Sequence, residues 1–163
     1  MTQIYISVGS NTNREHYIRM AVEELAIAFG DLTLSSVYES EAVGFHGDAF
    51  YNMVIGACTD RSVAECVAVF KAIEDKYGRI RGGEKFCGRT LDLDLLTYDQ
   101  LVCKEPVELP RDEITKNAFV LLPLSELAPA QLHPLTGQNY QQMWHSYNEP
   151  QKLWQVEFNW PDA

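Results

Sequence analysis

The alternation of strand-like and helical segments is the feature of this sequence that most constrains its fold. Apolar residues recur at helical spacing over residues 14–29, and a second helix follows Ser62, with Glu65 three residues later as the partner expected in a capping box. Strand-like segments lie around these helices, at residues 3–8, 32–40, 50–58 and 90–98. The order β-α-β-β-α-β predicts an α+β protein with a ferredoxin-like core, in which helices cover one side of a sheet containing antiparallel strands.

The remainder of the chain adds elements to this core. Helix-prone stretches follow at residues 117–127 and 140–147. A C-terminal extension, residues 148–163, contains alternating apolar positions that suit either an added strand on the sheet or a surface for a partner. A chain of 163 residues can bury one sizeable core but is short for two. We therefore expect a single domain over residues 1–163, with extra C-terminal helices and a strand.

Composition and charge exclude several classes of function. The formal net charge of −10 argues against a surface for nucleic acid or anionic membranes. No run approaches the roughly 18 apolar residues that span a bilayer, and the N-terminus lacks the basic and apolar regions of a secretory signal. The 4 cysteines include no Cys-x-x-Cys pair, which fits reduced thiols. These features predict a cytoplasmic protein that binds neither nucleic acid nor membrane; we also expect it to be a monomer.

Two carboxylates stand two residues apart in the apolar run that forms the last core strand. Asp92 and Asp94 would project from one face, while Leu91, Leu93 and Leu95 share the other. Two anions so close repel each other unless a cation neutralises them. Mg²⁺ does this well and takes its remaining ligands from water and substrate phosphates. The alternative is a strand with a polar, solvent-facing side, and these residues alone do not decide between the two.

A basic, glycine-bearing segment precedes the two aspartates. It spans residues 78–88 and contains Arg79 and Arg81, and Arg89 follows directly. Arginine binds phosphate bidentately, so these side chains beside a metal would suit phosphoryl transfer; the alternative is a solvated loop. Neither a Walker-type loop nor a Gly-x-Gly-x-x-Gly turn occurs, so any nucleotide is bound by another device.

Two further polar residues allow more than one interpretation. Glu74 lies near the apolar face of the second helix, where it could orient a donor group or metal-bound water, or simply be a half-exposed residue at a helix end. Asn52 lies inside a strand, a position that asparagine disfavours. Its amide could contact the edge of a heterocycle, or it could be a turn partner at the end of the strand.

Five motifs occur along the chain in one order. They are Gly9-Ser10-Asn11, Phe50-Tyr51-Asn52, residues 89–96 (Arg-Thr-Leu-Asp-Leu-Asp-Leu-Leu), residues 119–129 and residues 133–137 (His-Pro-Leu-Thr-Gly). With these motifs the chain resembles the 6-hydroxymethyl-7,8-dihydropterin pyrophosphokinase family of folate biosynthesis over nearly its whole length. The resemblance implies a ferredoxin-like α+β fold and transfer of pyrophosphate from ATP to the hydroxymethyl oxygen of the pterin, with release of AMP.

The resemblance also implies roles for individual residues. Those expected to be catalytic are Arg79, Arg89, Asp92 and Asp94, and the two aspartates would hold a pair of Mg²⁺ ions. Those expected to bind the pterin are Ser40, Val43, Phe50, Asn52 and Phe119. Those expected to bind ATP are Glu74, Arg81 and Arg89.

The sequence departs from the family pattern on the side of the ATP donor. Phe86-Cys87-Gly88 stands where the family usually has Trp-Gly-Pro, and Arg111 stands where a histidine usually contacts ATP phosphates. Asn117 replaces an arginine and Glu108 a threonine near the nucleotide. We expect Arg111 to take over the phosphate contact. The alternative is a paralogue that binds a pterin or nucleotide, with an altered substrate or without transfer activity.

Overall fold

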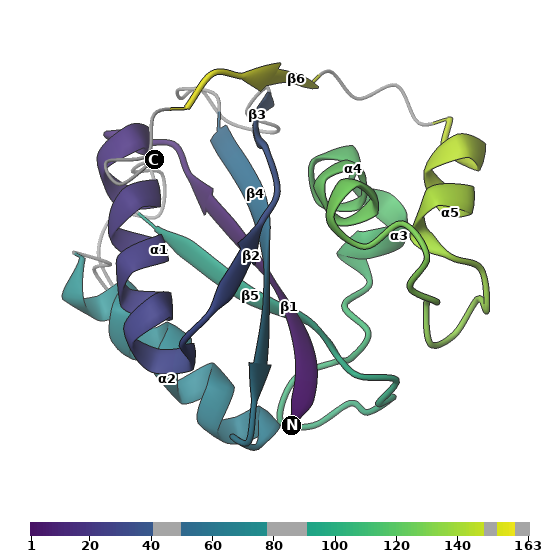
Figure 1. Ribbon diagram of the computed structural model, residues 1–163, viewed down its shortest axis with the longest axis horizontal. Helices are drawn as coiled ribbons and strands as arrows, with labels where there is room; N and C mark the ends of the chain where they lie inside the picture. The colour runs from purple at the N-terminus through teal and green to yellow at the C-terminus, as the bar shows by residue number, and fades with distance from the viewer. Residues whose placement is uncertain (41–49, 78–90, 149–152, 159–163) are drawn as a thin grey trace.

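The computed structural model describes residues 1–40, 50–77, 91–148 and 153–158, and it forms a single sheet with helices on both faces (Figure 1). Its elements, in chain order, are β1 (Thr2–Ser10), α1 (Arg14–Phe29), β2 (Leu32–Leu34), β3 (Val37–Ser40), β4 (Phe50–Thr59), α2 (Val63–Lys76), β5 (Asp92–Tyr98), α3 (Glu113–Lys116), α4 (Ala118–Leu127), α5 (Tyr140–Ser146) and β6 (Leu153–Val156). Among the described helices, none has the length and apolar character needed to cross a membrane.

The sheet has the strand order β5-β1-β4-β3-β6, with β2 also pairing with β4, and the pairs between these strands are antiparallel. The predicted β-α-β-β-α-β order is therefore confirmed. The segment 32–40 forms two short strands rather than one, because the chain leaves the ladder at Ser35. The Ser35 hydroxyl accepts a hydrogen bond from the backbone N–H of Val54 at 2.9 Å, a contact made by a backbone carbonyl in a regular ladder.

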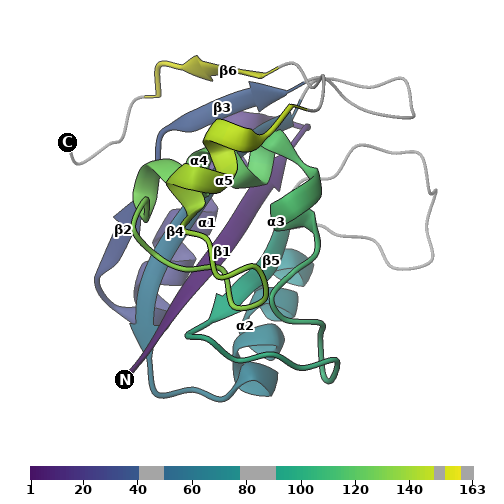
Figure 2. The ribbon, with the colours of Figure 1, turned by 90° about the vertical axis from the view of Figure 1, so that its right-hand side faces the viewer.

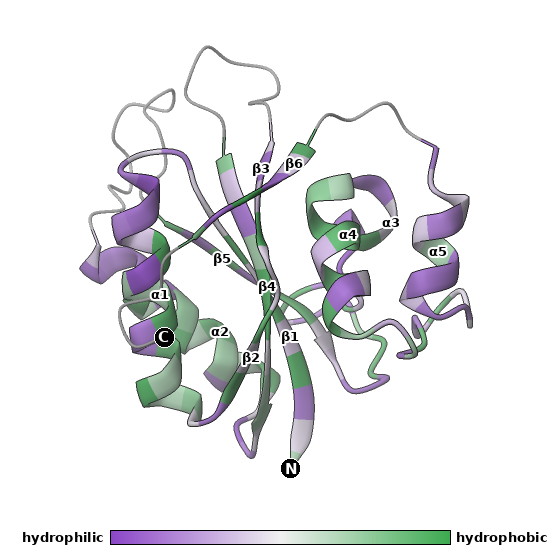
Figure 3. Ribbon diagram, turned by 45° about the horizontal axis from the view of Figure 1, so that its top comes forward, coloured by the Kyte–Doolittle hydropathy of each residue, from purple (hydrophilic) through white to green (hydrophobic). Residues whose placement is uncertain are grey.

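Alternating residues on the strands build a core on each face of the sheet. Ile4, Ile6 and Val8 of β1 pack toward α1 and α2. Val54 of β4 and Leu96 of β5 pack on the opposite face, with α4 and α5. The prediction of helices on one side thus holds for α1 and α2 only, since the C-terminal helices cover the second face (Figure 1). Figure 3 shows hydrophobic residues on the strands and on the helices packed against them.

The starts of the two core helices differ in their capping. α2 has the predicted capping box: the Ser62 hydroxyl accepts from the Glu65 N–H at 3.1 Å, and the Glu65 carboxylate accepts from the Ser62 N–H at 2.8 Å. α1 begins after Asn13, whose left-handed backbone (φ 45°) turns the chain directly from β1 into the helix. This turn brings the end of β1 close to the start of α1.

The C-terminal extension supplies the outer strand at one end of the sheet. β6 pairs with β3 in antiparallel register, from Val37 opposite Val156 to Ser40 opposite Leu153. Figures 1 and 2 show β6 lying beside β3, at the far end of the sheet from β5. Of the two interpretations left open for this segment, the added strand is correct for residues 153–156.

Candidate active site

Asp92 and Asp94 lie on β5, at one edge of the sheet. Leu91, Leu93 and Leu95 are buried toward α1 and α2, whereas Leu96 is buried on the opposite face, beside α4. The two carboxylates therefore project toward the face that carries the C-terminal helices, as the alternation in the sequence predicts. Both residues are half-buried, so they are neither core residues nor part of a freely solvated strand face.

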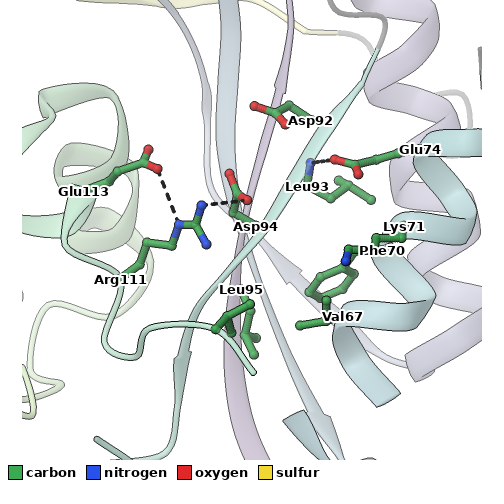
Figure 4. Close-up of a pocket in the computed structure, with 11 residues that line it drawn as sticks. Val67, Phe70, Lys71, Glu74, Asp92, Leu93, Asp94, Leu95, Arg111 and Glu113 are labelled. Atoms are coloured by element: carbon green, nitrogen blue, oxygen red, sulfur yellow. Dashed lines mark hydrogen bonds and ion pairs between the residues drawn. The ribbon is translucent and has the colours of Figure 1, made fainter. Parts of the chain in front are cut away.

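The charge on Asp94 is opposed by its surroundings. Burial, and then the negative charge of Asp92, raise the pKa of Asp94 to about 6, and Arg111 acts in the other direction. The Arg111 guanidinium lies 3.2 Å from the Asp94 carboxylate and 3.4 Å from that of Glu113 (Figure 4). Arg111 is held beside the strand by its backbone, because its N–H donates to the Leu96 carbonyl at 2.9 Å. In the protein alone, Arg111 therefore partly neutralises the carboxylate pair.

A cavity of about 470 Å³ opens at this edge of the sheet, between α2 and the segment that leads into α3 (Figure 4). Val67, Phe70 and Val107 give it an apolar wall, and the charged side chains of Asp92, Asp94 and Arg111 lie at its other side. An apolar wall with a few convergent polar groups is typical of small-molecule sites.

Glu74 joins α2 to the edge strand. It is only 4% exposed, and its carboxylate accepts a hydrogen bond from the Leu93 N–H at 2.8 Å (Figure 4). The interpretation of Glu74 as a half-exposed residue at a helix end is therefore wrong. Glu74 lines the cavity and fixes β5 against α2, which sets the direction of Asp92 and Asp94; its predicted contact with ATP stays a prediction.

Three of the residues predicted to bind the pterin, Ser40, Phe50 and Asn52, meet where β3 and β4 run side by side. The Asn52 side-chain amide donates to the Ser40 hydroxyl at 2.8 Å, and both residues are buried, with 4% and 5% of their surface exposed. Asn52 is thus inside the strand and is no turn partner at its end. Phe50 lies opposite Ser40 in the register, two residues before Asn52, so the two side chains share one face. That face is the one covered by α4, whose first turn carries Phe119 among the side chains packed there.

Gly9 lies between the two groups of residues. It is paired with Asn52 on one side and with Asp92 on the other, so these three form one row across β4, β1 and β5. Two strand spacings separate the aspartate from the asparagine, roughly 10 Å. A Cβ on Gly9 would lie 3.2 Å from the Asn52 carboxamide oxygen and 3.7 Å from the Phe50 ring. The absence of a side chain on Gly9 lets the Asn52 amide and the Phe50 ring lie close to its backbone.

Sequence reasoning missed three residues of this region. Gly9 entered only as part of a motif, although a glycine at the end of a buried strand indicates close approach of another group. Lys71 lines the cavity one turn before Glu74, and their spacing on the helix could have indicated it. Glu113 pairs with Arg111 through a contact that depends on the path of the chain after β5.

Four predicted residues lie outside the described part of the chain. These are Val43, Arg79, Arg81 and Arg89. The departures at Cys87 and Gly88 lie in the same undescribed stretch. Glu108 is exposed, and Asn117 precedes the first residue of α4 without a side-chain capping hydrogen bond.

Comparison with known proteins decides the family. The model of the 7,8-dihydro-6-hydroxymethylpterin-pyrophosphokinase (HPPK) family matches residues 5–129. The chain belongs to this family. The HPPK match covers β1 through α4 and ends before α5 and β6, and it confirms the resemblance predicted from the motifs.

Curated relatives support the same assignment. A 2-amino-4-hydroxy-6-hydroxymethyldihydropteridine pyrophosphokinase of Aquifex aeolicus is 33% identical over 138 residues, which cover 83% of this chain and 86% of the relative. The enzyme of that name from Porphyromonas gingivalis is 33% identical over 141 residues, covering 82% and 95%. Membership of the HPPK family supports one activity, the ATP-dependent transfer of pyrophosphate to hydroxymethyldihydropterin in folate synthesis. The sequence motifs predicted the same activity.

Solved structures agree on the fold. The wild-type HPPK-DHPS crystal structure of Plasmodium falciparum matches with a TM-score of 0.73 at 12% identity, over 90% of this chain. The matched part is 44% of that chain, so this protein spans less than half of its length. At this identity the likeness concerns the fold alone, and it confirms the predicted ferredoxin-like α+β architecture.

Proposed function

We propose that this chain transfers pyrophosphate from ATP to the hydroxymethyl oxygen of 6-hydroxymethyl-7,8-dihydropterin and releases AMP. One observation carries the proposal within the structure: Asp92 and Asn52 flank the bare backbone of Gly9 on one face of the sheet. An acceptor held at the asparagine would thus present its reactive group toward the carboxylates. The cavity at the edge of β5 lies on the far side of the same carboxylates, where a donor can enter.

Asn52 is prepared to bind a heterocycle. Its amide N–H₂ is engaged by Ser40, which fixes the orientation of the side chain. The carboxamide oxygen lies beside Gly9, where it could accept from a ring N–H of the pterin. Phe50 and Phe119 would stack on the two faces of the ring, with Val43 as a further contact, which gives a flat ring an apolar slot between aromatic side chains.

Asp92 and Asp94 fit a divalent cation. Burial, and then the negative charge of Asp92, raise the pKa of Asp94, and a bound cation would favour the ionised carboxylates against both effects. In the described stretches of the chain, no three His, Cys, Asp or Glu side chains form a metal site on their own. This suits Mg²⁺, which combines one or two carboxylates with water and substrate phosphates. We propose a pair of Mg²⁺ ions, which when bound would activate the hydroxyl group and neutralise the phosphates.

The donor side depends on Arg111 and the cavity. The apolar wall beside α2 suits the flat base of ATP, and Arg111 would exchange Asp94 for a donor phosphate once the carboxylates hold metal. Arg79, Arg81 and Arg89 would contact the polyphosphate, and Glu74 would hold the edge of the nucleotide site in place. In the reaction the hydroxymethyl oxygen bonds to the β-phosphorus, the bond from that phosphorus to the α-phosphate oxygen breaks, and AMP leaves.

A second candidate is a protein that binds a pterin or nucleotide without transfer. The observation that favours it is the ion pair between Arg111 and Asp94, which opposes entry of a cation at the carboxylates. The intact row of Asp92, Gly9 and Asn52 favours the pyrophosphokinase, because a binding protein has no need to align acceptor and metal.

Product analysis distinguishes the two functions. The protein is incubated with hydroxymethyldihydropterin, ATP and Mg²⁺, and AMP and pterin diphosphate are separated by chromatography. We expect both products in equal amounts, and a loss of about two orders of magnitude or more in rate for Asp94→Asn. Asp60→Asn, at an exposed aspartate, is the matched control and should retain the wild-type rate. Pterin binding without AMP formation would exclude transfer and establish the binding protein.

A further inference from the structure

The C-terminal segment 153–158 contacts the strands that carry the pterin residues. It lies beyond residues 5–129, which the family model matches, and its β6 portion pairs with β3. Without β6, β3 would be an outer strand with unpaired backbone groups. The register places Leu153 opposite Ser40 and Trp154 opposite Glu39, so the segment reaches the last residue of β3 that the pterin site uses.

Side chains of the segment attach it to α1 through Glu39. The indole N–H of Trp154 donates to one carboxylate oxygen of Glu39 at 2.9 Å, and the Arg14 guanidinium contacts the other at 2.5 Å. The Arg14 and Glu39 side chains are 26% and 20% exposed, so solvent screens this ion pair less than a pair on the open surface. Glu39 thus joins β6 on one side and α1 on the other.

Aromatic contacts attach the end of the segment to β4. Phe158 packs edge-on against Tyr51, with ring centres 6.4 Å apart. Arg14 lies over the Tyr51 ring at 4.0 Å, and Arg19 lies over the Phe158 ring at 5.1 Å. Tyr51 stands between Phe50 and Asn52 in the sequence, and its side chain points to the opposite face of the sheet. The segment therefore packs on one face of β4, directly opposite the face that carries Phe50 and Asn52.

We propose that residues 153–158 form a clamp that positions Ser40 and Asn52 for the acceptor, and that Trp154 and Phe158 are its positioning residues. The inference rests on the proposed function, since it takes the pterin to bind at Ser40 and Asn52. The Ser40–Asn52 hydrogen bond spans β3 and β4, and the clamp braces both strands: β6 pairs along β3, and Phe158 packs on β4. The donor cavity lies at the opposite edge of the sheet, beyond β4 and β1. Damage to the clamp should consequently weaken acceptor binding and leave donor binding unchanged.

The test uses Trp154→Phe, which keeps an aromatic ring but removes the N–H that Glu39 accepts. We expect the Kd and KM for the pterin to rise about three- to tenfold, because the variant loses a hydrogen bond to a charged group. The kcat and the KM for ATP should stay within about twofold of the wild-type values. Trp144→Phe, in α5, is the matched control; Trp144 stacks on Tyr147 and should leave every constant unchanged. Thermal melting of each variant establishes that it is folded.

A double-mutant cycle checks that the effect passes through Glu39. Glu39→Gln alone should also weaken pterin binding, and adding it to Trp154→Phe should cost less than the sum of the two single changes. Additive effects, an unchanged pterin Kd, or an equal rise in the KM for both substrates would each overturn the clamp. Pterin binding is measured by titration with Mg²⁺ and a non-hydrolysable ATP analogue present, so a wild-type protein that binds no pterin under these conditions would refute the proposed function instead.

Discussion

Asp94, which we propose to be catalytic, carries its negative charge in unfavourable surroundings. Its pKa of about 6 exceeds the usual aspartate value near 4, chiefly because burial and Asp92 disfavour the carboxylate. Such a residue stabilises the folded protein less when it is ionised than when it is neutral. At neutral pH the ionised Asp94 therefore lowers the stability of the protein, an effect that the proposed metal would offset; carboxylates with perturbed pKa values cluster at functional sites.

Replacing Asp94 with asparagine should stabilise the metal-free protein. The amide has a similar shape and no charge, so at pH 7 in EDTA we expect the free energy of unfolding to rise by about 1–3 kcal/mol, the upper bound being two pKa units at 1.36 kcal/mol each. Urea denaturation measures this value. Asp60→Asn, whose side chain is exposed, should change it by less than about 0.5 kcal/mol.

The pH dependence of this gain provides a stricter check. Between pH 6 and pH 4 folded Asp94 takes up a proton before unfolded Asp94 does, because its pKa is raised in the folded state. Lowering the pH through this window therefore raises the contribution of residue 94 to the free energy of unfolding in the wild type. In the asparagine variant this contribution does not change, because the amide does not titrate. The advantage of Asp94→Asn should therefore shrink from pH 7 to pH 4, and a constant difference would show that charge is not its cause.

The elements α4 and β3 are joined by one carboxylate. Glu126 accepts from the Ser36 backbone N–H at 3.0 Å and from the Ser36 hydroxyl at 2.8 Å, and its other oxygen accepts from the Tyr38 hydroxyl at 2.6 Å. Burial and this carboxylate raise the pKa of Tyr38, so its hydroxyl stays a donor. Because α4 carries Phe119 at its other end, this contact also sets where the helix places one wall of the proposed pterin site.

Substituting Glu126 with glutamine should loosen α4. An amide offers one acceptor oxygen where the carboxylate uses two, so at least one of the three donors loses its partner, at about 1–3 kcal/mol of unfolding free energy. Pterin binding should weaken in parallel while ATP binding does not. Urea denaturation and ligand titration measure the two effects, and Glu23→Gln, an exposed residue of α1, serves as the control. A variant as stable as the wild type would mean that apolar packing alone holds the helix.

Sequence patterns predicted elements better than their arrangement. α1 and α2 follow from helical spacing and a capping box, and the face of Asp92 and Asp94 follows from strand alternation, since these are local properties. The division of β2 from β3 depends on a side chain, Ser35, that replaces a ladder contact. The helices on the second face, and the contact of Arg111 with Asp94, depend on how the chain returns after β5, which no local period encodes.

Across the whole molecule, the two halves of the site meet over one residue without a side chain. The described residues that we propose to bind the pterin belong to β3, β4 and α4, and the carboxylates and cavity belong to β5, α2 and residues 107–113. β1 lies between them and contributes Gly9, paired with Asn52 and with Asp92. The sheet thus fixes the separation proposed for acceptor and donor, and under this proposal the two substrates approach each other over Gly9.

Adding a methyl group at Gly9 tests this arrangement directly. In Gly9→Ala the new Cβ would lie 3.2 Å from the Asn52 carboxamide oxygen and would occupy the space proposed for the pterin. Alanine suits a strand better than glycine, so the melting temperature should be preserved. We expect pterin affinity to fall about tenfold or more, since a steric block in a buried site costs over 1.4 kcal/mol, with ATP affinity unchanged.

A second glycine provides the contrast that makes the result specific. A Cβ on Gly56 would lie 2.5 Å from the Thr33 hydroxyl, in the part of β4 that pairs with β2 and away from the site. Gly56→Ala should therefore lower the melting temperature while the folded fraction binds pterin normally, the reverse of Gly9→Ala. If Gly9→Ala bound pterin like the wild type, the acceptor could not lie between Asn52 and Asp92, and the alignment of donor and acceptor across β1 would have to be abandoned.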